Sequence, residues 1–275
     1  MRPTRRILLS LFCLQLALPA LSRAADYTLQ NTTTVASFNE NGLTSVKDID
    51  SGAAVRFASD AWSLTLDGAT LRSEDSRPQV RKTVTGEIIY SYQLSDTRIE
   101  AVYRLQPGWR FVTKQLKVLH APNASFTVHR ITPVAMTLSG EIRSAFIPSS
   151  YEPQIGETIA QTRKGLPGKD YGAFLRLAND NGVMLVVQNP YLDVEHHGQS
   201  VSIDYAPEMP WQASWGAFTS DIACIGPYRL SGQRLPREMI LEWKLPPSSN
   251  PDDGMDRSEI SSFTDCVHAF LLDAS

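Results

Sequence analysis

The segment WSLTLDGATL, residues 62–71, decides the class of fold. Apolar and polar side chains alternate through residues 62–66, Asp67-Gly68 follows, and the alternation resumes at residues 69–71. A period of two places alternate side chains on opposite faces of a strand, and Asp-Gly is a favoured turn between antiparallel strands. The segment therefore predicts a β-hairpin.

The same pattern of short strand and turn continues along the chain. Strand-like stretches cover residues 88–94, 99–105, 109–119, 174–178, 183–187, 201–205 and 239–243. Turn residues separate several of them, among them Pro107-Gly108 and the run at 179–182. No long segment between Tyr27 and Trp243 keeps apolar residues at helical spacing, which disfavours a parallel α/β fold. We predict an all-β domain over residues 25–245, built as a large antiparallel sandwich.

Composition excludes several classes of protein. The 275 residues include 42% hydrophobic residues, 26 Lys+Arg and 29 Asp+Glu, for a net charge of −3. A chain of this length and hydrophobicity can bury a substantial core, so it is neither disordered nor a small disulfide scaffold. The absence of a basic excess argues against a nucleic-acid partner.

Residues 1–24 have the pattern of a secretory signal peptide. Three arginines fall within the first six residues, residues 7–21 are mostly apolar, and Ser22 and Ala24 are small residues at a cleavage site. A membrane anchor is the alternative, but the apolar run is short of about 20 residues and is interrupted by Gln15 and Pro19. We expect a secreted or periplasmic protein with no membrane span after cleavage. The leader holds four arginines and no acid, so the net charge becomes −7.

Two cysteines remain once the leader, which contains Cys13, is set aside. Cys224 and Cys266 form an even pair in an oxidising compartment, and a bridge would close a loop of about 42 residues worth roughly 4 kcal/mol. Two unpaired buried thiols are the alternative.

The end of the chain has a different composition from the rest. Residues 246–255 are rich in Pro, Ser, Asn and Asp and predict a linker. Residues 256–275 predict a helix that begins with Asp256 and Glu259 in a capping box and leads out of the domain. Its apolar positions share one face: Ile260, Phe263, Val267, and Phe270 or Leu271. That face could pack on the sandwich or on a partner.

One candidate site is the polar segment at residues 193–197. On a strand, Asp193, Glu195 and His197 share one face and His196 lies on the other. This spacing suits a divalent ion, although a solvated strand end gives the same pattern. We assign no metal or other cofactor, and retain His196 and His197 as candidate carbohydrate contacts.

The second candidate is the aromatic segment at residues 205–215. Tyr205, Glu208, Trp211 and Trp215 lie close together in a segment that contains two prolines. A stiff aromatic loop offers flat apolar faces and polar groups to a sugar at low ordering cost. The alternative is that both tryptophans close the core. Paired carboxylates for glycosidic cleavage cannot be chosen from one sequence, although five acids are available: Glu152, Glu157, Glu195, Asp204 and Glu208.

Several short peptides resemble one known family. They are NGL at 41–43, LDG at 66–68, YRL at 103–105, NPYLDV at 189–194, YAP at 205–207, GPYRL at 226–230 and EWKLPP at 242–247. The chain resembles the N-terminal β-supersandwich that precedes the catalytic barrel of large exported bacterial glycoside hydrolases, including α-galactosidase-like proteins. That domain is similar in fold to galactose mutarotase. The resemblance implies a carbohydrate-related accessory domain, with a downstream or separate barrel supplying catalysis.

No catalytic residue is carried over, because the mutarotase His and Glu contexts are not matched in this sequence. Three functions follow as hypotheses. The first is an accessory module that binds an oligosaccharide or polysaccharide. The second is a sugar-active enzyme, an aldose epimerase or glycosidase, and the third is a structural domain that packs on a partner.

Overall fold

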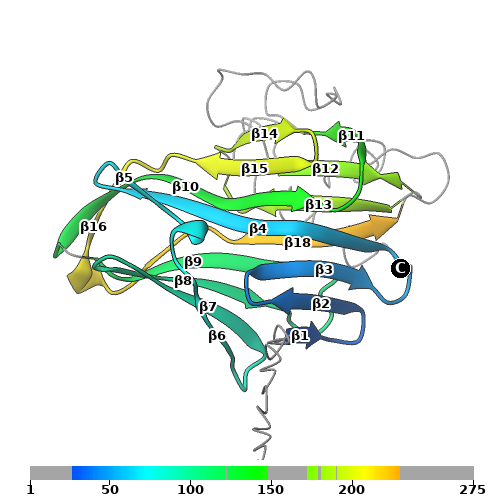
Figure 1. The fold of residues 1–275 in the computed structure, drawn as a ribbon, viewed down its shortest axis with the longest axis horizontal. Helices are drawn as coiled ribbons and strands as arrows, with labels where there is room; N and C mark the ends of the chain where they lie inside the picture. The colour runs from blue at the N-terminus through cyan, green and yellow to red at the C-terminus, as the bar shows by residue number, and fades with distance from the viewer. Residues whose placement is uncertain (1–26, 122, 148–171, 179–180, 190, 230–275) are drawn as a thin grey trace, which may run out of the picture.

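The computed structural model describes residues 27–121, 123–147, 172–178, 181–189 and 191–229. The predicted leader, the strand at 239–243, the linker at 246–255 and the helix at 256–275 lie outside the described residues. Within them the all-β prediction is confirmed: two nine-stranded antiparallel sheets face each other, and the described residues contain no α-helix (Figure 1). No described helix is long and apolar enough to cross a membrane.

The first sheet, sheet I, has the order β1-β2-β3-β4-β10-β15-β14, with β5 paired to β4 and β16 to β10. Its strands are β1 (Tyr27–Gln30), β2 (Thr34–Asn39), β3 (Gly42–Asp48), β4 (Ala54–Leu66), β5 (Ala69–Arg72), β10 (Ser125–Leu138), β14 (Asp193–His197), β15 (Ser200–Tyr205) and β16 (Met209–Gln212).

The second sheet, sheet II, has the order β11-β12-β13-β18-β9-β8-β7-β6, with β17 paired to β9. Its strands are β6 (Gln79–Lys82), β7 (Glu87–Leu94), β8 (Thr97–Arg104), β9 (Val112–His120), β11 (Ile142–Phe146), β12 (Gly172–Leu177), β13 (Asn181–Val187), β17 (Phe218–Thr219) and β18 (Ala223–Arg229).

Local sequence explains the hairpins. Leu66 pairs with Ala69 across the predicted Asp67-Gly68 turn, and both turn residues have positive φ. A two-residue turn with positive φ at both positions matches the twist of the flanking strands, which explains the Asp-Gly pair. The second predicted hairpin is also present, because Leu175 pairs with Val183 between β12 and β13.

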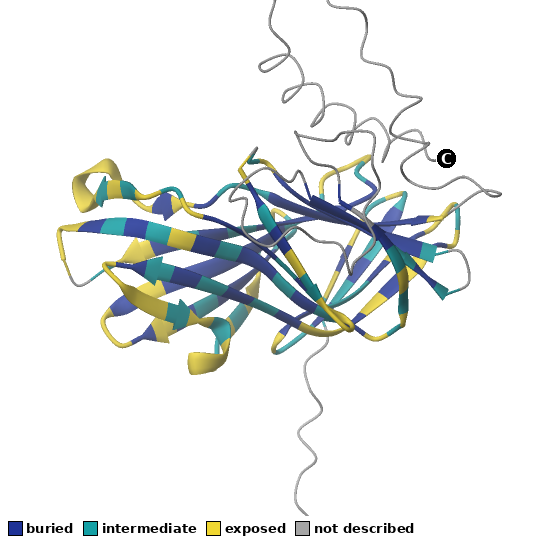
Figure 2. Cartoon of the chain, turned by 90° about the horizontal axis from the view of Figure 1, so that it is seen from above, coloured by how far each residue is buried: buried dark blue, intermediate teal, exposed yellow. Residues whose placement is uncertain are grey.

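The core lies between the two sheets, where the alternating apolar side chains of both meet. Figure 2 shows the result as bands of buried and more exposed residues along each strand. Trp62 of sheet I packs edge-on against Tyr92 of sheet II, with ring centroids 5.0 Å apart, and Phe38 packs in the same way on Tyr103 at 5.1 Å. Fully burying one such large apolar side chain contributes roughly 1.5–3 kcal/mol, so these contacts hold the sheets together.

A buried ion pair also joins the two sheets. Lys114 of β9 places its Nζ 2.6 Å from Asp60 Oδ1 of β4 and donates to the carbonyl of Ala61 at 2.8 Å. The Tyr103 hydroxyl and the Leu43 amide donate to Asp60 Oδ2, so both carboxylate oxygens have partners. A buried charge is tolerated only with such partners.

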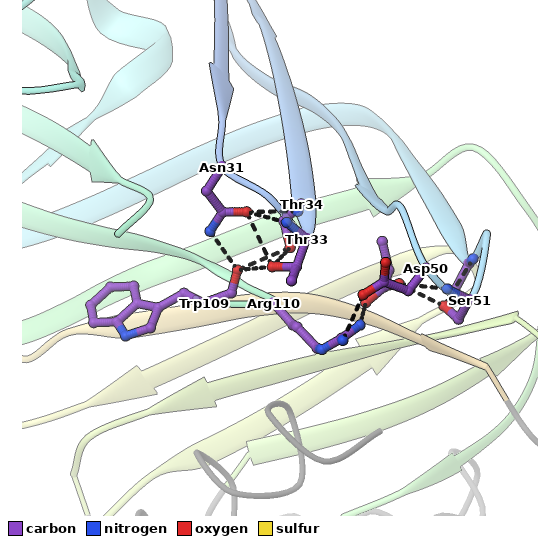
Figure 3. A network of polar contacts seen from close by, with 9 residues as sticks. Asn31, Thr33, Thr34, Asp50, Ser51, Trp109 and Arg110 are labelled. Carbon is purple, nitrogen blue, oxygen red and sulfur yellow. Dashed lines mark hydrogen bonds and ion pairs between the residues drawn. The ribbon is translucent and has the colours of Figure 1, made fainter. Parts of the chain in front are cut away.

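A second network of polar contacts joins the segment before β9 to sheet I (Figure 3). Arg110 donates from Nη1 to Asp48 and from Nη2 to Asp50, each at 2.7 Å. The preceding Trp109 carbonyl accepts from Asn31 Nδ2 at 2.8 Å and from the Thr34 hydroxyl at 3.0 Å. Burial by itself raises the pKa of Asp48, but hydrogen bonds from Ser51 and Arg110 bring it below its ordinary value.

One irregularity in the strand pairing of sheet I lies where β10 passes from β15 to β16. Tyr205 of β15 pairs with Ile131, and Met209 of β16 pairs with Val128, both on β10. Three residues, 206–208, therefore lie opposite two residues, 129–130. One strand carries an extra residue, which is a β-bulge, and bulges redirect the side chains near them.

Candidate functional site

The predicted aromatic segment forms a compact turn at residues 211–218, which we call the aromatic turn. The indole of Trp211 meets Trp215 at 5.4 Å and Phe218 at 5.3 Å between ring centroids, both edge-on. Trp211 Nε1 donates to the carbonyl of Gly216 at 3.0 Å. Gly216 has φ +93, a conformation that suits glycine and lets its amide bond back to Ala213.

The two tryptophans have different environments. Trp211 packs partly against the core, whereas Trp215 is 58% exposed. The short 3₁₀ turn Ala213–Trp215 is held in place because the Ala213 amide donates to the carbonyl of Ala124 at 2.8 Å. The turn therefore exposes the indole ring of Trp215 to solvent, while the hydrogen bond to Ala124 holds its backbone in place.

A hollow of about 330 Å³ borders the aromatic turn. Its walls come from the end of β9, the segment that follows, the start of β10 and the turn itself: Val118, Leu119, His120, Ala121, Asn123, Ala124, Phe126, Ala213, Gly216 and Ala217. The lining is mainly apolar, with one imidazole and one amide. This mixture of apolar surface and a few polar groups is typical of small-ligand sites.

Glu208 lies on the bulge and pairs with a histidine. Glu208 Oε2 is 2.6 Å from His129 Nδ1, and both side chains are accessible to solvent. Glu208 also has φ +45, a left-handed conformation that costs energy for a residue with a Cβ. Sequence analysis selected Glu208 but missed His129, because 79 residues separate the two and only the pairing of β10 with β16 joins them.

A cluster of carboxylate side chains lies on the outer face of sheet I. Asp204 is directly opposite Asp193 across β15 and β14, and Arg130 Nη1 lies 2.8 Å from Asp204 Oδ2. Burial raises the pKa of Asp204 to about 6; Arg130 acts against this, and the charges of Asp193 and Glu195 act with it. Burial and Glu195 also raise the pKa of Asp193. These carboxyl groups therefore titrate above the usual range for aspartate.

The other predicted site residues lie elsewhere or have structural contacts. Tyr205 is buried, and its hydroxyl accepts from the Asp221 amide at 2.8 Å, which ties β15 to the segment before β18. His197 pairs with Ser200 at the opposite end of β15 from Tyr205, roughly 17 Å along the strand. The structure therefore brings Trp211 and Trp215 together, but places His196 and His197 away from them.

Asp193, Glu195 and His197, whose spacing would suit a divalent ion, do not form a metal-binding cluster. His197 Nε2 lies 3.9 Å from Glu195, and no group of three or more metal-binding side chains occurs among the described residues. Burial lowers the pKa of His196, which favours its neutral form. Cys224 is buried on β18, where burial raises its thiol pKa to about 12, and Cys266 lies outside the described residues. The proposed disulfide stays a prediction.

A polar groove, separate from the aromatic turn, was not predicted from the sequence. One hollow of about 560 Å³ and another of about 260 Å³ share Arg77 and Tyr92 in their walls. Asn39, Glu74 and Gln93 also line them. Arg77 is held across the groove by Glu40 at 2.6 Å. The lining residues come from several strands and turns that are far apart in the sequence, so no single sequence motif predicts the groove.

Comparison with known proteins gives similarity of fold. No known family model matches the sequence, and no curated protein matches it. Among solved structures, a galactose mutarotase related enzyme from Lactobacillus acidophilus aligns at 11% identity and TM-score 0.47, over 73% of this chain and 96% of that one. A galactose mutarotase-like protein from Lactobacillus casei aligns at 13% identity and TM-score 0.45, over 74% and 100%.

A third solved structure is a bacterial glucoamylase in complex with acarbose. It aligns at 10% identity and TM-score 0.43, over 76% of this chain and 32% of the larger protein. The predicted all-β sandwich is shown by the two antiparallel sheets themselves. Function has to be argued from the residues of this chain.

Proposed function

We propose that this protein is a carbohydrate-binding domain, and that the sugar ring packs against the aromatic turn. The observation that carries the proposal is Trp215, a large aromatic ring exposed to solvent yet braced by Trp211. An exposed ring on a fixed backbone gives contact area at low ordering cost, and its flat face suits the C–H face of a sugar ring.

The adjoining hollow supports the same proposal. Asn123 and His120 line it and offer an amide and an imidazole for sugar hydroxyl groups, while Leu119 and the alanines of the turn keep its surface apolar. The leader at residues 1–24 supports export, so we propose that the ligand is met outside the cytoplasm. A catalytic barrel, downstream or separate, is part of the same proposal.

Affinity electrophoresis on galactan and other plant polysaccharides, followed by calorimetry with the retarding glycan, tests the proposal. We expect retardation by at least one glycan, and a loss of at least about tenfold in affinity for Trp215→Ala, because truncating a central aromatic contact commonly costs 2 kcal/mol or more. Tyr191→Ala, which removes another exposed aromatic ring, is the matched control and should bind normally. Equal affinity of the two variants, or no binding to any glycan, would contradict the proposal.

A second candidate function, a sugar-active enzyme, is favoured by the Glu208–His129 pair. A carboxylate in contact with an imidazole can move a proton, as epimerisation or hydrolysis requires. Both groups are accessible to solvent, and Glu208 has the strained left-handed backbone conformation. Wild-type turnover on nitrophenyl glycosides, or faster mutarotation of galactose or glucose, would support it. Glu208→Gln should then lower turnover by roughly 10²–10⁴-fold, whereas Glu195→Gln should not. Absence of turnover in the wild-type protein would remove this candidate.

A further inference from the structure

A continuous row of polar side chains crosses the outer face of sheet II. Five residues that are directly paired on neighbouring strands form it, and we call them the polar strip: Gln79, Ser91, Glu100, Lys117 and Thr219. The residues that flank Ser91 and Glu100 along their strands, such as Tyr92 and Ile99, lie in the core, so the strip faces outward. Five strands at a spacing of about 4.8 Å give it a length of roughly 19 Å.

Two arginines converge on the centre of the strip. Glu100 has a nearly buried side chain, and its Oε1 accepts from Arg81 Nη2 at 3.2 Å and from the Ser91 hydroxyl at 3.1 Å. Arg98 Nη2 lies 3.6 Å from the same oxygen. The arginine side chains are themselves 56% and 51% exposed. Both guanidinium groups therefore meet at one oxygen of Glu100, while about half of each arginine side chain remains exposed to solvent.

The charge around Glu100 is positive, although the whole chain carries a net charge of −3. Arg81, Arg98 and Lys117 surround the single carboxylate of Glu100, and Lys117 is its direct cross-strand partner. The nearest other acid in sequence is Asp96, in the turn before Arg98. Three cations beside one carboxylate leave a positive charge that attracts an anion, and guanidinium groups bind carboxylate or sulfate oxygens in a forked geometry.

The strip is continuous with the aromatic turn. It ends at Thr219, four residues after Trp215 in the sequence. Arg98 is also paired with His120, which lines the hollow beside the turn. A chain-like ligand that stacks on Trp215 can therefore extend over the strip.

We propose that the polar strip binds the acidic groups of an anionic polysaccharide, with Arg81 and Arg98 as the contacts and Glu100 as their positioning residue. This inference rests on the proposed carbohydrate-binding function and names its ligand class. Carboxylate and sulfate groups share the required chemistry. A nucleic acid is the less favoured polyanion, because the net charge of the chain is −3 and the cations occupy one small area.

Calorimetry with three glycans tests the inference: polygalacturonate, a sulfated galactan and neutral galactan, at low and at raised salt. We expect at least one acidic glycan to bind about tenfold or more tightly than neutral galactan at low salt, and salt to reduce that preference. The preferred acidic glycan tells a carboxylate ligand from a sulfate ligand. The double variant Arg81→Gln/Arg98→Gln should lose the preference by about tenfold and keep its affinity for neutral galactan.

The matched control is Arg56→Gln/Arg143→Gln, which removes the same charge from exposed positions on β4 and β11. It should retain the preference, and unchanged thermal unfolding of both double variants shows that each is folded. Equal loss in the two double variants, no preference for acidic glycans, or equally tight binding of a DNA oligonucleotide would overturn the inference while Trp215-dependent binding stands. No binding to any glycan would instead overturn the proposed function itself.

Discussion

At the scale of single residues, Asp204 is the clearest case of a side chain whose chemistry is set by its surroundings. Its carboxyl group is buried on sheet I, opposite Asp193, with Arg130 on one side. Burial is the largest influence and raises the pKa to about 6. The folded protein therefore favours the protonated form of Asp204 more than the unfolded chain does.

This pKa predicts how stability changes with pH. Because the folded-state pKa lies above the unfolded value of 3.8, the stabilising contribution is complete below about pH 4 and is lost as pH rises toward 6. The free energy of unfolding of the wild type should therefore fall by up to about 3 kcal/mol relative to Asp204→Asn over this range. Urea unfolding of both proteins from pH 3.5 to 7 measures this, and parallel pH profiles would contradict it.

The two tryptophans of the aromatic turn have different roles. Trp211 is braced by Phe218 and by a hydrogen bond to Gly216, and it supports Trp215. Sequence analysis could place the two tryptophans together, because they lie four residues apart in one short loop. It could not tell which ring is exposed, since that depends on how the turn closes around Phe218 and on its contact with Ala124, which lies outside the turn.

At the scale of elements, the pairing of β13 with β18 places a glycine beneath a buried tyrosine ring that leaves no room for a side chain. Gly182 pairs with Tyr228, and a Cβ built on Gly182 would lie 2.2 Å from Cζ of the tyrosine ring. The ring covers the glycine, and the tyrosine hydroxyl donates to the carbonyl of Leu175 on β12 at 3.1 Å. The glycine is therefore required by packing between strands and not by its backbone angle.

We predict that Gly182→Ala destabilises the protein by roughly 1–3 kcal/mol, the usual cost of overpacking a core. Gly140→Ala, at a position with open space around it, should change the free energy of unfolding by less than about 0.5 kcal/mol. Chemical denaturation measures both. In a Tyr228→Leu background the cost of Gly182→Ala should become smaller, and an unchanged cost would show that the tyrosine ring is not responsible.

The interruption opposite residues 129–130 also belongs to the scale of elements. β15 ends at Tyr205 and β16 begins at Met209, and both pair with β10. The three residues between them form the bulge, and one of them, Glu208, contacts His129. Alternation along residues 201–205 predicted β15 correctly. The bulge was not predicted, because its position depends on the register between strands that are far apart in the sequence.

At the scale of the whole molecule, the buried pair of Lys114 and Asp60 joins the two sheets. Both side chains are fully buried, and each lies on a different sheet. Burial lowers the pKa of Lys114, and the charge of Asp60 acts against this. Removing the lysine would leave the carboxylate of Asp60 in the core without its counter-ion.

Lys114→Met should therefore lower the free energy of unfolding by about 3–5 kcal/mol. The double change Asp60→Asn/Lys114→Met should recover part of the loss, because no unpaired charge remains. Urea unfolding with Lys117→Met as a control on the same strand tests this. A loss no larger than that of the control would show that the pair contributes little to stability.

Short-range patterns in the sequence were sufficient to predict the class of fold and the local hairpins. Alternating side chains and turns such as Asp67-Gly68 act over a few residues, so they specify hairpins without knowledge of the rest of the chain. The aromatic turn was predictable for the same reason. Tertiary structure alone decided which distant residues meet: Asp60 with Lys114 across the core, His129 with Glu208 at the bulge, and Glu100 with Arg81 and Arg98 on the polar strip. These contacts depend on strand register and on the packing of one sheet against the other, and neither is encoded in any short stretch of sequence.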